Sequence, residues 1–405
     1  MNFAFTQEDE DLRKEVQTFI KTHLNEDVLH ELKVERDTGH RGPLAAAFFD
    51  SVYEKGYFGL CWPVENGGLG RSAMAQFVVE DEFYRATDMR IGSVGSGAPG
   101  ILVCGTEAQK KHYLPPVLRR EFVFAQGYTE PGCGTDLAGI KCRAIRTGDK
   151  YVINGQKIYV TDAHTATHIY LMVRTDPNST RHRGLSILLV PMNTPGIAVR
   201  PLWTLQNEPE APLGTCYGIG RVNEVFFADV EVAVDCLLGD EGDGWNVATR
   251  GLNLDRVGAH RYLISVTRDE DIVNWLNNDP AGLAKRDDPV VRDKVAEMWI
   301  EGQVCRLMTM RSLSIVMRGA DFAYEGSAEK VWAPEHGVRA SEAYAQIIGP
   351  HAQLLSSSPE AADRGIFAHN MLGAFQSTVN HGSAPAMRDQ VARRGLGLPR
   401  PPRGK

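Results

Sequence analysis

The chain has 405 residues, of which 43% are hydrophobic and 23% charged, a composition typical of a soluble globular protein of two or three domains. Its formal net charge of −7 argues against nucleic-acid binding, because no basic block offsets the acidic excess. The seven cysteines are scattered without Cys-x-x-Cys spacing, so we expect reduced thiols, no metal site and a cytoplasmic location. We expect no signal peptide and no membrane span, because acidic residues follow the first Met and every apolar run is short.

The first part of the chain, residues 1–121, is predicted to be an α-helical domain. Leu12, Val16 and Phe19 fall on one helix face, and Thr6 with Asp9 three residues later is typical of a helix N-terminus. Further helices are expected over residues 44–57, 73–86 and 109–118.

Residues 122–239 change to a β-strand pattern and predict a compact, barrel-like β domain. Tyr151–Ile153 and Gln156–Val160 flank Asn154-Gly155, a dipeptide that favours a tight hairpin. Further strands are expected over residues 168–174, 185–190, 197–202 and 223–232.

Residues 240–394 return to helical patterns and predict an antiparallel helical bundle. The helices are expected over residues 245–268, 290–319, 339–349 and 364–394. The tail, residues 395–405, is rich in Gly and Pro and is expected to be extended or disordered.

One loop carries the most specific motif. Tyr128-Thr129-Glu130-Pro131-Gly132-Cys133-Gly134-Thr135-Asp136 resembles the first signature of the acyl-CoA dehydrogenase family, Thr-Glu-Pro-Gly-x-Gly-Ser-Asp. Glycines in such a turn let main-chain N–H groups approach a flat ligand. The resemblance covers nearly the whole chain and implies an α+β fold with an N-terminal helical domain, a central β domain and a C-terminal four-helix bundle. It also implies FAD as cofactor and α,β-dehydrogenation of an acyl-CoA.

The resemblance assigns the flavin to two stretches and one C-terminal serine. Tyr159-Val160-Thr161 stands where the family usually has Trp-Ile-Thr, so Thr161 is implied to hydrogen-bond the flavin ring and Tyr159 to shield one face. An aromatic and a hydroxyl at a strand end suit a half-buried edge equally well. The implied cofactor-binding residues are Tyr128, Thr129, Gly134, Thr135, Tyr159, Val160, Thr161 and Ser383, with Thr135 also facing the substrate.

The proton acceptor departs from the family pattern. Most members place a Glu in a C-terminal Tyr-Glu-Gly-Thr motif, where this chain has His381. A minority place it in a Leu-x-x-Glu-Arg helix segment, where this chain has Asp255 followed by Arg256. A carboxylate suits proton abstraction when burial raises its pKa. We therefore expect Asp255 to be the base, with His381 as the alternative, Arg256 orienting nearby groups and Asn253 facing the substrate.

A second departure concerns the segment that family members lend to a neighbouring subunit. Arg-x-x-Phe-Gly and a downstream Gln would hold the flavin pyrophosphate, but this chain has Asn278–Gly282 and Pro289 there. A pyrophosphate beside Asp279 without an Arg is disfavoured. This asymmetry resembles the α subunits of heterotetrameric, sterol side-chain-degrading acyl-CoA dehydrogenases of actinobacteria.

The resemblance implies further partners and leaves alternatives open. The expected partners are a paralogous subunit or a second copy of the chain, an acyl-CoA with a steroid side chain, and an electron-transfer flavoprotein. The alternative functions are a flavin monooxygenase on the same fold and a non-catalytic subunit that stabilises an active partner.

Overall fold

The computed structural model describes residues 5–91, 95, 97–179, 181–208, 210–211, 213, 218–255, 260–320 and 323–399, with only the backbone at 252–255, 260 and 261. Two compact units emerge, and each is described by itself. The helical unit contains residues up to Gln17, Ala73–Arg90 and Val257–Lys405. The sheet unit contains Thr18–Ser72 and Ile91–Arg256. The domain boundaries at 121, 239 and 394 stay a prediction.

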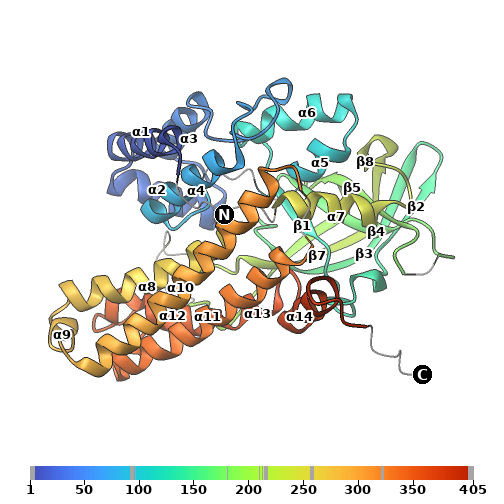
Figure 1. The fold of residues 1–405 in the computed structure, drawn as a ribbon. Coiled ribbons are helices and arrows are strands. Elements are labelled where there is room, and N and C mark those ends of the chain that lie inside the picture. The colour runs from blue at the N-terminus through green and yellow to red at the C-terminus, as the bar shows by residue number, and fades with distance from the viewer. Residues whose placement is uncertain are drawn as a thin grey trace. The chain divides into compact units, whose positions relative to one another are not determined.

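The sheet unit is built around an eight-stranded sheet (Figure 1). Its strands are β1 (Phe124–Gly127), β2 (Arg143–Thr147), β3 (Lys150–Thr161), β4 (His168–Arg174), β5 (Leu185–Pro191), β6 (Ile197–Leu202), β7 (Val222–Ala233) and β8 (Leu237–Leu238). The strand order is β6-β7-β3-β2-β4-β5-β8, and β1 pairs in parallel with β4. Nearly every residue of β4 and β5 is buried, so these strands form the core of the sheet.

The helices of the sheet unit come from parts of the sequence before and after the strands. They are α2 (Glu26–Thr38), α3 (Pro43–Glu54), α5 (Ala98–Cys104), α6 (Glu107–Leu118) and α7 (Gly244–Asp255). A capping box starts α6, because Thr106 Oγ1 accepts from the Gln109 N–H and the Gln109 side chain accepts from the Thr106 N–H. The predicted helix over 109–118 therefore begins two residues earlier.

The hairpin predicted at Asn154-Gly155 is wrong. Strand β3 runs through both residues, and the turn between β2 and β3 lies at Gly148-Asp149. Gly155 marks a bulge instead, because the pairing of β3 with β7 shifts between Ile153 and Gly155. A Cβ on Gly155 would lie 2.8 Å from the Cys142 Cα, so close backbone approach explains this glycine.

The helical unit packs long helices side by side (Figure 1). Its helices are α4 (Ala73–Thr87), α8 (His260–Asn278), α9 (Pro280–Leu283), α10 (Pro289–Val316), α11 (Glu325–Ile348), α12 (Ile366–Ala374), α13 (Gln376–Val379) and α14 (Ala384–Gln390), with the first part of α1 (Gln7–His23). The predicted helix over 339–349 covers only the second half of α11, which continues through Pro334. The predicted helix over 364–394 is interrupted before α14. The described parts of the predicted helix over 245–268 belong to α7 and α8.

The predicted start of the first helix is confirmed. The Asp9 N–H donates to Thr6 Oγ1 at 3.2 Å, and the Thr6 N–H donates to Asp9 Oδ2 at 3.0 Å. This reciprocal pair satisfies two N–H groups at the helix terminus.

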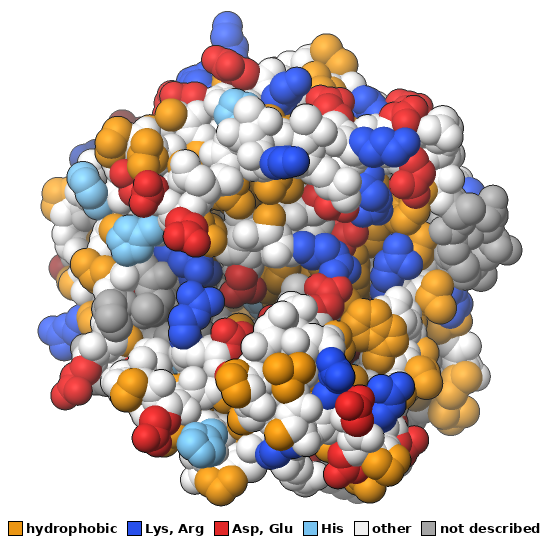
Figure 2. Space-filling model, turned by 90° about the vertical axis from the view of Figure 1, so that its left-hand side faces the viewer, with side chains coloured by type: hydrophobic (Ala, Val, Ile, Leu, Met, Phe, Trp, Pro, Cys, Tyr) orange, Lys and Arg blue, Asp and Glu red, His pale blue; other side chains and the backbone are white. Residues whose placement is uncertain are grey.

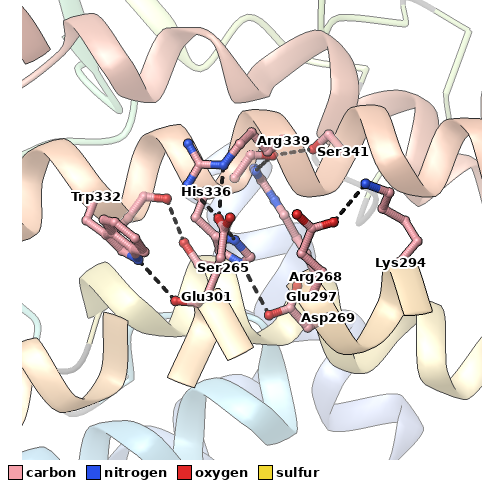
Figure 3. A network of polar contacts seen from close by, with 12 residues as sticks. Ser265, Arg268, Asp269, Lys294, Glu297, Glu301, Trp332, His336, Arg339 and Ser341 are labelled. Atoms are coloured by element: carbon pink, nitrogen blue, oxygen red, sulfur yellow. Dashed lines mark hydrogen bonds and ion pairs between the residues drawn. The ribbon is translucent and has the colours of Figure 1, made fainter. Parts of the chain in front are cut away.

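A buried polar network joins three helices of the bundle (Figure 3). Asp269 on α8 is 1% exposed, accepts from the Tyr344 hydroxyl and lies 3.2 Å from His336 Nε2, both on α11. On the other side of the imidazole, His336 Nδ1 lies 3.4 Å from Glu301 Oε2 on α10. Glu301 also pairs with Arg339. Buried charges are tolerated when they are paired in this way, so the network fixes how the three helices align.

Basic, acidic and apolar side chains are interspersed on the face drawn in Figure 2. Among the side chains that the figure shows in colour, neither sign of charge forms an extended patch. Among the described helices, none is both long enough and apolar enough to cross a lipid bilayer.

Replacement of Tyr344 tests the buried network. Tyr344→Phe removes a donor to the buried Asp269 carboxylate, so the free energy of unfolding should fall by about 1–3 kcal/mol. Chemical denaturation of the purified protein measures this change. Ser341→Ala is the matched control, because the Ser341 hydroxyl bonds to the Gly337 carbonyl of its own helix at 2.7 Å and its loss should cost less. Equal stability of Tyr344→Phe and the wild type would contradict the assigned role.

A second prediction concerns pH. Burial, reinforced by Asp363, Asp88 and Glu270, raises the pKa of Asp271 to about 7. In the unfolded chain an Asp titrates near about pH 4, so the folded protein binds more protons between these two values. The free energy of unfolding should therefore decrease as pH rises from about 4 to about 7. Asp271→Asn stays neutral and should flatten that decrease in a denaturation series, whereas Asn at the exposed Asp287 should leave it intact.

Candidate functional site

The loop after β1 is held from beneath by one buried acid. The side chain of Glu130 is 7% exposed and accepts from Lys157 Nζ at 2.8 Å, while the Lys157 side chain is fully buried. The remaining capacity of the carboxylate is taken by the N–H groups of Lys141 at 2.7 Å and Cys142 at 2.9 Å. Lys157 Nζ also donates to the Tyr128 carbonyl at 3.1 Å. Glu130 is therefore a structural anchor of the motif.

The glycine turn above this anchor is closed by backbone hydrogen bonds and open on its outer side. Glu130 and Cys133 exchange N–H to carbonyl bonds of 2.9 and 3.0 Å. A Cβ on Gly132 would meet nothing within 4 Å, and one on Gly134 would meet only a Thr129 methyl at 3.9 Å. Gly134 and Thr135 are exposed. A flat ligand could therefore lie close to this main chain.

The thiols at the turn do not supply a nucleophile. Burial and the Glu130 charge raise the pKa of Cys133. Burial also raises the pKa of Cys142 to about 11. Both thiols therefore stay protonated near neutral pH.

The end of β3 lies against the same loop. The Ile158 N–H donates to the Thr129 carbonyl at 2.9 Å, which places residues 159–161 beside the motif. Val160 is fully buried, whereas Tyr159 is 65% exposed and Thr161 is exposed. Tyr159 has a φ of 57° at a shift in the β3–β7 pairing between Lys157 and Val160. This bulge turns the Tyr159 ring out of the strand alternation.

The helix with the candidate base is positioned by two close approaches. A Cβ on Gly244, at the start of α7, would lie 2.6 Å from the Ser186 backbone, and one on Gly251 would lie 3.2 Å from Gly100 of α5. Asn253 and Asp255 fall in α7, but their side chains, and Arg256 as a whole, lie outside the described residues. The structure thus positions their helix and leaves their roles as predictions.

The C-terminal candidates belong to the helical unit. His381 is exposed with a φ of 49°, and Ser383 takes the N-cap position of α14 without a side-chain cap bond. The buried Lys330 Nζ donates to the Ser377 carbonyl and to Asn380 Oδ1. This lysine therefore holds the chain that leads into His381.

The segment without the family's Arg, Phe and Gln is occupied by helix caps. Asp279 Oδ1 accepts from the Ala281 N–H at 2.8 Å and the Gly282 N–H at 3.4 Å, and Asp288 caps α10 in the same way. Two cations follow in sequence: Lys285 donates to the carbonyls of Ile347 and Ile348 at 2.7 and 3.1 Å, and Arg286 pairs with Asp287 at 3.4 Å. Lys285 thus stabilises the C-terminus of α11, and its amine is committed there.

Sequence reasoning missed the anchoring residues Lys157 and Arg174. Lys157 occupies a buried position of β3, and a charge on the inner face of a strand requires a partner. The alternation of buried and exposed positions along β3 was the signal that the sequence offered. The five carbonyls that Arg174 binds lie in two different loops, and no local pattern in the sequence indicates them.

Comparisons with known proteins agree with this architecture. The acyl-CoA dehydrogenase N-terminal, middle and C-terminal domain models match residues 6–121, 125–217 and 242–396. The acyl-CoA dehydrogenase FadE29 of Mycobacterium tuberculosis (strain ATCC 25618 / H37Rv) is 33% identical over 100% of both chains.

Two solved structures share the fold over almost the full length. The "Tcur3481-Tcur3483 steroid ACAD" is 29% identical with a TM-score of 0.84, covering 99% of this chain and 100% of the other. The ChsE4-ChsE5 complex from Mycobacterium tuberculosis gives the same identity, TM-score and coverage. This chain belongs to the acyl-CoA dehydrogenase family, whose members are oxidoreductases acting on CH–CH groups.

Proposed function

We propose that the chain binds FAD at the edge formed by the glycine turn and the end of β3, and that it oxidises an acyl-CoA as one subunit of a heteromeric enzyme. The observation that carries the proposal is the Glu130–Lys157 anchor, because it holds Thr129 and residues 159–161 side by side with their outer surface open. FAD, when bound, would accept the hydride that leaves the β carbon of the acyl group.

The residues at this edge fit a flavin ring. Thr129, Thr135 and Thr161 supply hydroxyls, and the glycines give access to main-chain N–H groups. Such donors stabilise the electron density that a reduced flavin carries. The exposed Tyr159 ring offers an apolar surface for one face of the isoalloxazine. Gly134, Val160 and Tyr128 contribute backbone to the same edge, and Ser383 is assigned to the flavin by family resemblance.

Asp255 is the proposed acceptor of the α proton. It lies one helical turn after Gly251, where α7 packs on α5. A carboxylate at this place would remove the proton as the hydride leaves the neighbouring carbon. Asp is shorter than the usual Glu by one C–C bond, roughly 1.5 Å, so the substrate must approach α7 more closely. Arg256 would orient the surrounding polar groups and Asn253 would face the CoA arm. The alternative base, His381, is carried by the other unit.

A different, paralogous chain is the proposed partner. Asp279 and Asp288 cap helices and Lys285 is bound to two carbonyls, so none of them replaces the family's Arg. Arg286, the arginine of this segment, lies outside the family's Arg position and pairs with Asp287 at 3.4 Å. A second copy of this chain would therefore complete the flavin site poorly. The steroid ACAD and the two-chain complex among the similar structures support a heteromer and a bulky steroid side-chain CoA ester. An electron-transfer flavoprotein is the proposed electron acceptor.

Flavin content tests the two-chain proposal. We expect the chain expressed alone to contain little FAD, because no second chain supplies the pyrophosphate-binding Arg. Co-expression with a paralogous partner should restore visible flavin absorbance at one FAD per pair of chains. Stoichiometric FAD on a pure homo-oligomer would contradict the heteromeric proposal and leave the family assignment unchanged.

Substitution of Asp255 tests the base. Asp255→Asn keeps the size of the side chain but removes the proton acceptor, so FAD should stay bound while anaerobic reduction by an acyl-CoA slows by about 10²–10⁴-fold. Asp255→Glu restores the family's reach and should keep or raise the rate. His381→Ala is the matched comparison and should change the rate little. The opposite pattern, an active Asp255→Asn and an inactive His381→Ala, would move the base to the C-terminal position.

A further inference from the structure

The segment that presents Thr161 at the end of β3 begins and ends with a residue in the left-handed region of the backbone. Tyr159 has a φ of 57° and Asp162 a φ of 56°, so the chain changes direction on either side of Thr161. Thr161 itself is exposed and pairs with Val222 of β7. Residues other than Gly persist in this conformation only where the surrounding contacts hold them there. Contacts around residues 159–162 must therefore fix this segment.

All the polar groups of Asp162 take part in such contacts. Arg221, the residue before β7, donates from Nε to Asp162 Oδ1 at 2.9 Å and from Nη2 to Oδ2 at 2.7 Å. The Asp162 N–H donates to the Arg221 carbonyl at 2.8 Å, and the Asp162 carbonyl accepts from the N–H groups of Thr165 and Ala166, both at 3.1 Å. A bidentate bridge fixes the orientation of the two groups as well as their distance. Arg221 thus holds Asp162 through both its side chain and its main chain.

A buried amide of β7 holds the other side of Thr161. The Asn223 side chain is fully buried, and its Nδ2 donates to the Val160 carbonyl at 3.2 Å and to the Arg221 carbonyl at 3.0 Å. Thr161 therefore lies between a residue bound by Asn223 and a residue bound by Arg221, while its own side chain faces outward.

The exposure of the bridge indicates a local role. The Asp162 and Arg221 side chains are 35% and 30% exposed. An ion pair that is open to water contributes little to the overall stability of a protein. The effect of this bridge is therefore expected mainly in the backbone that it holds, which is the segment that ends in Thr161 and Asp162.

We propose that Asp162 is a positioning residue of the flavin site: through its bridge to Arg221 it holds Thr161 in the orientation that hydrogen-bonds the flavin ring. The inference rests on the proposed function, because Thr161 has this role only if FAD lies at this edge. A donor that is already fixed before the flavin binds stabilises the reduced ring without a cost of ordering. Without the bridge, residues 159–162 would relax from their left-handed conformation, and the flavin would have to order Thr161 itself.

FAD affinity and the flavin reduction potential test this role in the protein with its partner chain. Asp162→Asn keeps the size of the side chain and the tolerance for left-handed backbone but removes the charge from the bridge. It should weaken FAD binding roughly tenfold and lower the reduction potential, because the reduced ring loses a fixed donor. Arg221→Gln should do the same. The matched control is Glu231→Gln, which breaks the 2.8 Å pair with Lys150 between the same two strands and should change neither quantity.

The sign of the two potential shifts separates positioning from a direct effect of charge. Asp162→Asn leaves an additional positive charge near Thr161 and Arg221→Gln an additional negative one, so direct electrostatics would move the potential in opposite directions. Shifts of opposite sign would therefore overturn the positioning role. An unchanged FAD affinity in Asp162→Asn would overturn it as well.

Amide hydrogen exchange distinguishes failure of this inference from failure of the proposed function, because it needs no flavin. In the flavin-free protein, the N–H groups of Asp162, Thr165 and Ala166 should exchange faster in Asp162→Asn than in the wild type or in Glu231→Gln. Wild-type exchange in Asp162→Asn would overturn the inference. If the wild type with its partner binds no FAD, the proposed function fails and this inference with it. If the wild type binds FAD and Asp162→Asn binds it equally tightly, this inference alone fails.

Discussion

The candidate site depends on the ion pair between Glu130 and Lys157, which is buried beneath the glycine turn. Burying two charges is expensive, and the cost is offset only when the remaining hydrogen-bonding capacity is satisfied. Here the carboxylate takes two backbone N–H groups of the segment leading into β2, and the ammonium takes the Tyr128 carbonyl. One pair thus connects the turn, β2 and β3. Loss of either partner would leave an unpaired buried charge and release the turn, the strand end and the bulge at Tyr159 together.

Much of the fold could be predicted from local patterns, and the errors have a common cause. The Thr6–Asp9 cap and the strands over 168–174 and 197–202 were predictable because their signals are short-range. Asn154-Gly155 led to a wrong prediction. Its turn propensity is real, but this glycine is required because the Cys142 backbone, in the segment that leads into β2, approaches it closely. The prediction left out the first half of α11, which continues through Pro334 although Pro disfavours a helix interior. In both cases tertiary packing overrode a local preference.

For the candidate site, too, the residues could be predicted from the sequence but their arrangement in space could not. The motif residues could be named from sequence, since glycines and hydroxyls at fixed spacing are a local pattern. The reason that Thr129 lies beside residues 159–161 could not, because it depends on Ile158 binding across to the loop. Arg174 is a clearer example, because it lies 36 residues after one partner, Ala138, and 7 residues before another, Arg181. The two loops that it binds are therefore more than thirty residues apart in the sequence. A side chain that binds segments distant in the sequence can be identified only from the three-dimensional structure.

The departure from the family pattern at Asn278–Pro289 is explained by the contacts of the charged residues in that segment. A family member that binds flavin in a symmetric pair must both hold the ring and lend a cation. In this chain the edge proposed for the ring is open, while the segment that would lend the cation has Asp279 and Asp288 as caps and Lys285 bound to the end of α11. Restoring an Arg there would place it among groups already satisfied by the helix ends. In the proposed heteromer, a partner of different sequence would supply the cation that this segment lacks.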